Sequence, residues 1–234
     1  MTLPNTFLIR KLTLFLAAAM LSVSAMAADF NQIQRLANQG NATAQVKLGM
    51  FYYKGEGVRQ DYAKAREWYE RSANQGNPLA QGVLGLIYYH GEGVRQDHSK
   101  AFELFQKSAN QGDATAQGML GMLYYKGEGV RQDYAKAVEW YEKSANQGEV
   151  KSQYNLGLKY YKGEGVRQDY AKAVEWIQKA ANQGYAEAQF ALGLMYYNGN
   201  GLRQNTATAK EYYGKACDNG NQNGCDGYRT LNLR

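Results

Sequence analysis

The chain has 234 residues, of which 44% are hydrophobic and only two are proline, and this composition excludes a disordered protein. Its formal net charge is +6, with acidic and basic residues interspersed along the chain. Because this charge balance is mild and mixed, it argues against nucleic acid as a partner.

The first segment, residues 1–27, is predicted to be a cleaved signal peptide. Arg10 and Lys11 form a short basic region, an apolar run follows at 12–23, and residues 25–27 give the small-x-small pattern of a cleavage site. The apolar run is shorter than the roughly 20 residues that a membrane span requires. Cleavage would lower the net charge from +6 to +4, because Arg10 and Lys11 are the only charged residues removed. We therefore expect an exported bacterial protein, periplasmic or secreted, that does not insert into a membrane.

A repeated motif organises the rest of the chain. It reads Gly-Glu-Gly-Val-Arg-Gln-Asp-Tyr-Ala-Lys-Ala from Gly55, and related copies begin at Gly91, Gly127, Gly163 and Gly199. Each copy starts 36 residues after the previous one, and a strict period of this length is typical of stacked repeat arrays. The period gives five full units between two partial ones: an N-terminal capping helix at 28–40, units at 41–76, 77–112, 113–148, 149–184 and 185–220, and a C-terminal cap at 221–234.

Each unit is predicted to be a helical hairpin. In the first unit, apolar and small residues recur at helical spacing over Ala42–Lys54 and again over Tyr62–Gln75. Gly55 is placed to end the first helix in a left-handed conformation, Asp61 is a suitable N-cap for the second helix, and Gly76 follows its end. The predicted fold is therefore all-α.

A glycine inside the first helix of every unit indicates close helix packing. Gly49 recurs at the same place in all five copies, although a glycine in a helix interior costs about 1 kcal/mol relative to alanine. We expect the second helix to press onto this glycine, with Ala65 or Ala73 nearby and with Trp68 or Tyr69 as the bulky neighbour.

The residues from Ala44 to Gly76 form a pattern that resembles the Sel-one-like repeat, a relative of the tetratricopeptide repeat. It reads Ala-x-x-x-Leu-Gly-x-x-Tyr-x-x-Gly-x-Gly-Val-x-x-Asp-x-x-Lys-Ala-x-x-Trp-x-x-x-x-Ala-x-x-Gly. Departures are few, since Leu104 and Tyr212 replace the tryptophan and Ser152 replaces an alanine. The resemblance implies a right-handed α-solenoid of helical hairpins whose concave side is lined mostly by the first helices. It also implies the binding of a protein or peptide rather than catalysis.

The five copies differ mainly on one face of the first helix, which makes that face the candidate binding surface. At 100° per residue the near-constant positions lie on one side of the helix and the variable positions on the other. On the variable side, the position of Met50 is apolar in every copy and the position of Lys54 is basic in most. An apolar stripe with a basic rim suits a peptide that carries acidic groups. The candidate partner groove consists of Val46, Lys47, Met50, Lys54, Leu86, Met122, Lys126, Tyr154, Leu158, Lys162, Phe190 and Leu194.

The apolar stripe has a second interpretation, in which the side chain of Met50 and its equivalents pack against the next first helix and meet no partner. The sequence leaves both interpretations open. The opposite side of the second helix is predicted to be a solvated surface with acid-first i, i+4 pairs. These pairs are Glu67–Arg71, Glu103–Lys107, Glu139–Lys143, Glu175–Lys179 and Glu211–Lys215.

Other motifs point only weakly to chemistry. The Gly-Glu-Gly loop lacks the third glycine and the Gly-Lys-Ser/Thr ending of phosphate-binding loops, so a turn is favoured. Glu56 and Asp61 are too few oxygen ligands for calcium, and His90 and His98 alone do not make a zinc site. We therefore expect no cofactor and no metal.

Cys217 and Cys225 are the two cysteines, and an even number of cysteines in an exported chain favours a disulfide. Cys217 stands at the position of Ala73, and Cys225 at the position of Gln45. Their spacing is similar to that of the helix-linking bridges in the cysteine-rich branch of the family. The bridge would tie the final cap to the last unit, and two free thiols are the alternative.

The sequence thus predicts a non-enzymatic scaffold that binds a protein or peptide in the periplasm. One alternative is a secreted or surface factor that acts on host proteins. A further alternative follows from the resemblance, because some cysteine-rich relatives are associated with β-lactam binding or hydrolysis. The chain contains no Ser-x-x-Lys, Ser-Asp-Asn or Lys-Thr-Gly motif, which argues against the enzyme.

Overall fold

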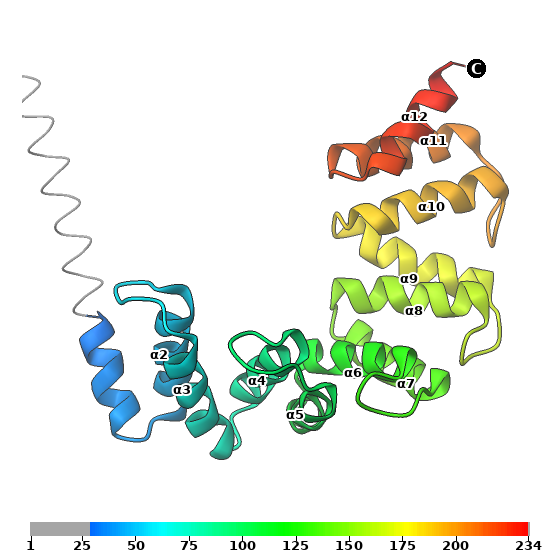
Figure 1. Cartoon of the computed structure of the whole chain (residues 1–234). Coiled ribbons are helices and arrows are strands. Elements are labelled where there is room, and N and C mark those ends of the chain that lie inside the picture. The colour runs from blue at the N-terminus through cyan, green and yellow to red at the C-terminus, as the bar shows by residue number, and fades with distance from the viewer. Residues whose placement is uncertain (1–28, 234) are drawn as a thin grey trace, which may run out of the picture. The chain divides into compact units, whose positions relative to one another are not determined.

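The computed structural model describes residues 29–233, and all regular secondary structure within that range is helical (Figure 1). Each repeat consists of a first helix and a second helix joined by a short loop. The first helices are α2 Ala42–Lys54, α4 Pro78–His90, α6 Ala114–Lys126, α8 Val150–Lys162 and α10 Ala186–Asn198. The second helices are α3 Tyr62–Asn74, α5 His98–Asn110, α7 Tyr134–Asn146, α9 Tyr170–Asn182 and α11 Thr206–Asp218. A helix at 29–38 precedes the hairpins, and α12 Gln222–Asn232 follows them.

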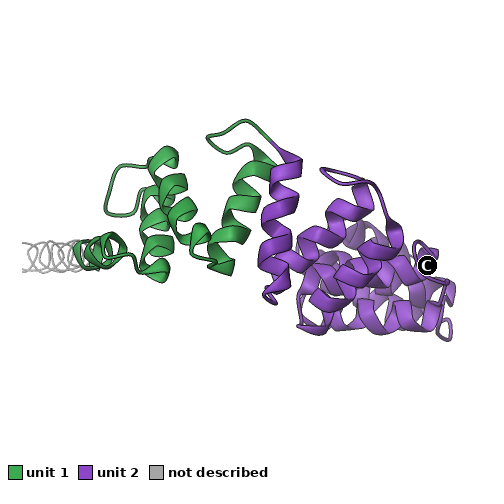
Figure 2. Ribbon diagram, turned by 90° about the horizontal axis from the view of Figure 1, so that it is seen from below, with its two compact units in different colours: residues 1–96 green, residues 97–234 purple. Residues whose placement is uncertain are grey.

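The predicted all-α chain of hairpins is confirmed. The predicted signal peptide at 1–27 lies outside the described residues. The chain forms two compact units, one that extends to Gln96 and one that begins at Asp97 (Figure 2). We call them unit 1 and unit 2.

Capping side chains and glycines determine where the helices begin and end. Asp61 accepts a hydrogen bond from the amide of Lys64 at 3.0 Å, as an N-cap does. The same bond forms at Asp97, Asp133, Asp169 and Asn205. Gly55 ends α2 with φ 72°, a left-handed conformation that side chains disfavour, and its amide donates to the carbonyl of Phe51. Both predicted caps are confirmed.

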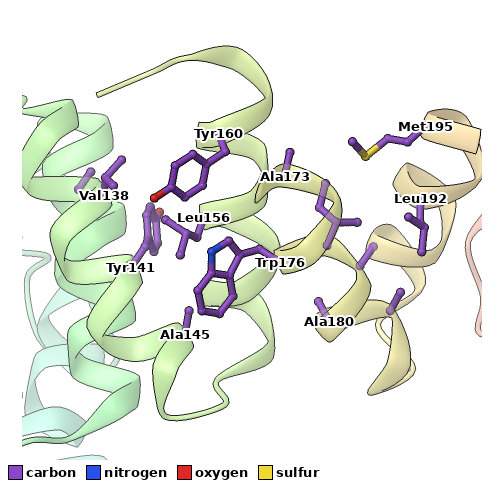
Figure 3. Packing of buried hydrophobic residues seen from close by; sticks show 14 of the residues in the cluster. Val138, Tyr141, Ala145, Leu156, Tyr160, Ala173, Trp176, Ala180, Leu192 and Met195 are labelled. Atoms are coloured by element: carbon purple, nitrogen blue, oxygen red, sulfur yellow. The ribbon is translucent and has the colours of Figure 1, made fainter. Parts of the chain in front are cut away.

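Small and apolar side chains fill the core of each unit. In unit 2, Leu156 of α8, Ala173 of α9 and Leu192 of α10 belong to one buried cluster (Figure 3). In unit 1, Ile33 of the helix at 29–38 packs with Leu48 of α2. Burial of each leucine or isoleucine contributes about 1.5–3 kcal/mol, so these shared clusters hold successive helices together.

A glycine inside α2, α6, α8 and α10 allows the second helix of the same hairpin to approach closely. A Cβ atom on Gly49 would lie 2.7 Å from the ring of Tyr69, and one on Gly157 would lie 2.6 Å from Cγ1 of Ile177. Such distances are shorter than van der Waals contact, so only glycine fits without a shift of the neighbour. The predicted close approach is confirmed, and the bulky neighbour in the first hairpin is Tyr69 rather than Trp68.

A buried glutamine links each second helix to the next first helix. The Nε2 atom of Gln45 donates to the carbonyl of Ala37 at 3.1 Å. Equivalent bonds run from Gln81 to Ala73, Gln117 to Ala109, Gln153 to Ala145 and Gln189 to Ala181. Between α11 and α12, Cys225 stands in place of the glutamine and forms a disulfide with Cys217. The predicted disulfide is thus formed, and it replaces a hydrogen bond that recurs elsewhere.

The outer surface of the second helices differs from the prediction. Among the described residues, only one of the five predicted pairs, Glu175–Lys179, forms an ion pair, with Nζ and Oε1 2.8 Å apart. Four of the five basic side chains lie over the aromatic ring three residues earlier, as Arg71 does over Trp68 at 4.4 Å from the centroid. The same contact recurs for Lys143 over Trp140, Lys179 over Trp176 and Lys215 over Tyr212. A cation on a ring face gains electrostatic attraction and also covers apolar surface.

Candidate functional site

In unit 1 a groove of about 430 Å³ lies between α2 and α4, and we call it groove 1. Its lining residues are Val46, Met50, Tyr53, Lys54, Tyr69, Leu79, Val83, Leu86, Ile87, His90 and Glu92. Met50 is 40% exposed and Leu79 is 54% exposed, so together they give groove 1 a solvent-accessible apolar surface. Val46, by contrast, is only 2% exposed, so it supports the floor and offers a partner little surface.

In unit 2 a smaller groove of about 230 Å³ lies between α8 and α10, and we call it groove 2. Its lining residues are Tyr154, Leu158, Tyr161, Ile177, Phe190, Ala191, Leu194, Met195 and Asn198. Groove 2 brings together the four predicted residues of its unit that lie on α8 and α10 and carry apolar or aromatic side chains. Leu194 is 38% exposed at its mouth.

Four of the predicted groove residues line neither groove. Lys47 is exposed on α2, and Lys126 and Lys162 are exposed at the ends of α6 and α8. Met122 is half-buried and packs against the core cluster of unit 2. The residues at the position of Met50 therefore divide between packing and exposure. Met122 and Leu158 contact the core, as the packing interpretation expects, while Met50 and Leu194 are exposed, as the groove interpretation expects.

The basic rim that the sequence predicted is largely neutralised by the loop that follows each first helix. Lys54 Nζ lies 3.5 Å from Glu56, a residue of the Gly-Glu-Gly motif. The same pairing joins Lys126 to Glu128 at 3.5 Å and Lys162 to Glu164 at 3.9 Å. The expected attraction for acidic peptides is therefore weaker than a row of unpaired lysines would give.

The loop glutamates also connect neighbouring repeats. The hydroxyl of Tyr53 in α2 donates to Oε2 of Glu92 in the next loop at 2.5 Å. This hydrogen bond, together with burial, raises the pKa of Tyr53 to about 12. In the last hairpin an asparagine replaces the glutamate, and Asn200 donates to the Tyr161 hydroxyl at 2.7 Å. Both tyrosines line a groove, so these bonds fix part of each wall.

Unit 2 contains one buried cation that the sequence analysis missed. Lys159 is 4% exposed at a position that carries Ile87, Leu123 and Met195 in other repeats. Its Nζ lies 2.6 Å from Glu164 Oε2 and 3.2 Å from the centroid of the Tyr125 ring. The hydrogen bond from Lys159 lowers the pKa of Glu164. A single polar residue at an otherwise apolar position was the signal for this site.

Within residues 29–233, no three His, Cys, Asp or Glu side chains gather as metal ligands. His98 Nδ1 lies 3.6 Å from Glu128 Oε2 in unit 2, and the ring of His90 packs on the ring of Tyr89 in unit 1. None of the described helices has both the length and the apolar character of a membrane span.

The sequence model of the Sel1 repeat matches five consecutive segments, 42–77, 78–113, 114–149, 150–185 and 186–221. Each segment starts one residue later than the corresponding predicted unit.

Among solved structures, the chain is similar to c5321, a protective antigen present in uropathogenic Escherichia coli strains. The two are 38% identical with a TM-score of 0.80, and the match covers 83% of this chain and 42% of c5321. A Sel1 repeat protein from Oxalobacter formigenes is 30% identical with a TM-score of 0.78, over 87% of this chain and 84% of that one.

Among curated proteins, a stretch of 42 residues is 45% identical to the ERAD-associated E3 ubiquitin-protein ligase component HRD3A of Arabidopsis thaliana. This stretch is 18% of the chain and 6% of the plant protein. The chain thus spans less than half of c5321 and only a small part of the plant protein.

Proposed function

Because the chain belongs to the Sel1 repeat family, we propose that it is a non-catalytic scaffold that binds a protein or peptide in the grooves of its first helices. The predicted α-solenoid class is shared with the similar solved structures. Solenoids of this kind expose the surfaces of successive helices as extended binding sites.

The observation that carries the proposal is the exposure of large apolar side chains in both grooves. Met50 and Leu194 are each about 40% exposed and stand above half-buried neighbours, Leu86 and Leu158. A purely solvated helix face would be polar at these places. Apolar grooves with a few polar groups at the edge are typical of peptide-binding sites, because burial supplies affinity and the edge supplies orientation.

The proposal includes export, which the disulfide supports. The disulfide between Cys217 and Cys225 requires an oxidising compartment to persist, such as the periplasm or the medium. The partner would therefore be a protein or peptide that is itself outside the cytoplasm.

The proposal is tested by placing a charge in each groove. Met50→Asp and Leu194→Asp should each weaken capture of a partner at least tenfold, because an aspartate cannot be desolvated against an apolar ligand. Capture from periplasmic extract would be quantified by mass spectrometry for the same partner in every variant.

The matched control is Leu36→Asp, because Leu36 is 37% exposed on the helix at 29–38, outside both grooves. All three variants should fold with similar urea midpoints. If Leu36→Asp reduced capture as much as the groove variants, or if none of them changed it, the grooves would not be the binding sites.

A second candidate is a surface or secreted factor that faces host proteins. The similarity to c5321, a protective antigen, favours it. Fractionation of the producing cells decides between the two, because this candidate requires the protein at the cell surface or in the medium.

A further inference from the structure

The first turn of α10 lacks the side-chain N-cap hydrogen bond that the other first helices have. Asn41, Asn77, Asp113 and Glu149 each cap their helix through a side-chain hydrogen bond to the amide three residues later. The N-cap of α10 is Tyr185, which makes no such bond. Loss of a cap costs about 1 kcal/mol, so a local gain elsewhere is expected.

The ring of Tyr185 packs against the ring of Tyr154, a residue that lines groove 2, and Tyr185 does not cap the helix. It lies edge-to-face with Tyr154, with ring centroids 5.3 Å apart, and Tyr154 lines the groove. Phe190, one turn along α10, lines the same groove and contacts the ring of Tyr213 at 5.6 Å. Groove 2 is therefore lined by two aromatic rings near the starts of α8 and α10, Tyr154 and Phe190, and we call these two with the adjoining Tyr185 the aromatic end.

Negative charge accompanies the aromatic end. Glu187 lies in the first turn of α10, four residues before Ala191, so it stands on the helix face that lines groove 2. Burial raises the pKa of Tyr185, and the carboxylates of Glu187 and Glu149 raise it further. Glu149 is occupied, since its carboxylate accepts the amide of Ser152. Glu187 is exposed and, within residues 29–233, forms no ion pair or hydrogen bond. Lys151, at the equivalent position of α8, forms no ion pair with it in the described structure.

We propose that groove 2 binds a segment of an exported protein in which a lysine or arginine is next to large apolar residues. The cation would lie against the rings of Tyr154 and Tyr185 with Glu187 as its counter-charge. The apolar residues would occupy the space lined by Leu158, Phe190 and Leu194. This inference rests on the proposed function and names its partner chemistry, which is basic rather than the acidic partner expected from the lysine rim.

The preference for a positively charged residue in the bound segment depends on Glu187. Ring faces attract cations, and the attraction is strongest where water is excluded. The N-terminus of α10 by itself favours an anion, so a cation gains there only if the carboxylate outweighs the helix dipole. Groove 1 offers no equivalent, because its acidic lining residue, Glu92, already accepts a hydrogen bond from the Tyr53 hydroxyl.

The test uses three fluorescein-labelled synthetic peptides that share the apolar sequence Leu-Phe-Leu and differ only in the preceding residue, Lys, Gln or Glu. Fluorescence anisotropy with the full chain measures each Kd. We expect the Lys peptide to bind about five- to tenfold tighter than the Gln peptide, and the Glu peptide to bind most weakly. The ratio between the Lys and Gln peptides should fall as salt is added.

Variants separate this inference from the proposed function. Glu187→Gln should bring the Lys and Gln peptides to within about twofold of each other, because the Lys peptide loses its counter-charge. Glu139→Gln, an exposed glutamate on α7, should change nothing. Leu194→Asp should weaken the Gln peptide about tenfold.

Equal affinity for the three peptides, with the loss in Leu194→Asp retained, would overturn the basic preference and leave the groove as a binding site. Tightest binding of the Glu peptide would do the same. Failure of all three peptides to bind at about 1 mM would overturn both the preference and the groove.

Discussion

The loops at 55–61 and 163–169 contain the same seven residues, Gly-Glu-Gly-Val-Arg-Gln-Asp, yet they have different surroundings. Apart from its two chain neighbours, no described residue has an atom within 4 Å of where a Cβ on Gly57 would stand. A Cβ on Gly165 would overlap the carbonyl of Tyr134, at the start of the second helix in the preceding hairpin. The second glycine of the motif thus serves the turn in one loop, and both the turn and the contact between repeats in the other.

The glutamates of these loops differ in the same way. Among the described residues Glu56 pairs only with Lys54, and both side chains are half exposed. Glu164 pairs with Lys162 and with the buried Lys159, and a hydrogen bond with Tyr125 of the preceding hairpin also lowers its pKa. A residue's role in this array is therefore set by the neighbouring hairpin as much as by its own sequence.

The largest expected effect comes from adding one methyl group to each loop. Both glycines have a positive φ, 70° at Gly57 and 75° at Gly165, so alanine at either place costs about 1 kcal/mol in backbone strain. Gly165→Ala also forces the loop away from Tyr134, and we expect a total loss of about 3 kcal/mol. Urea unfolding followed by far-UV circular dichroism gives both values.

The backbone strain is about the same in both variants. The difference between their free energies of unfolding therefore measures the contact between repeats. Hydrogen exchange should show faster opening of α7 and of the loop at 163–169 in Gly165→Ala only. Equal midpoints for the two variants would mean that the loop relaxes freely and that the contact has little energetic weight.

The next effect concerns the two glutamates. Glu164→Gln leaves Lys159 buried without a counter-charge, and we expect a loss of about 2 kcal/mol. Glu56→Gln removes an exposed ion pair, and its cost should be below about 0.5 kcal/mol. Thermal unfolding at neutral pH compares the two variants, and similar losses would contradict the assigned difference in burial.

The Glu164 contribution has a defined pH dependence. Its pKa is lower in the folded protein than its ordinary value of 4.5, so folding favours the ionised carboxylate. The stabilisation is present above pH 4.5 and is lost as the pH falls through the lower, folded-state pKa. The gap between wild type and Glu164→Gln should therefore close in acid, while Glu56→Gln follows the wild type throughout.

Features that depend on local chemistry were predictable from the sequence. The bounds of α2 at Ala42–Lys54 and the caps at Gly55 and Asp61 follow from helical spacing, a left-handed glycine and an N-cap carboxylate. The close approach at Gly49 followed because a glycine inside a helix needs a packing reason.

Features that depend on which side chains meet across hairpins were not predictable. The loop glutamate was assigned to the turn alone, because nothing near Glu92 in the sequence indicates Tyr53, which is 39 residues earlier. Arg71 was paired with Glu67 by spacing, but the aromatic face of Trp68 offers it more contact. The grooves were only partly predicted, because the distance between first helices is set by the buried residues beneath them, such as Ile177.

The smallest expected effect is that of Lys159→Met, which tests whether Lys159 alone makes Glu164 contribute more to stability than Glu56. Lys159→Met introduces the residue that the fifth hairpin has at Met195, and it removes the desolvation cost of a buried cation together with its ion pair. These two terms nearly cancel, so the stability should change by less than about 1 kcal/mol.

In the Lys159→Met background, Glu164→Gln should cost no more than Glu56→Gln, because the buried charge that required a partner is gone. A double-mutant cycle measured by urea unfolding gives the coupling. A coupling near zero would mean that Glu164 acts through Tyr125 and Lys162 rather than through Lys159.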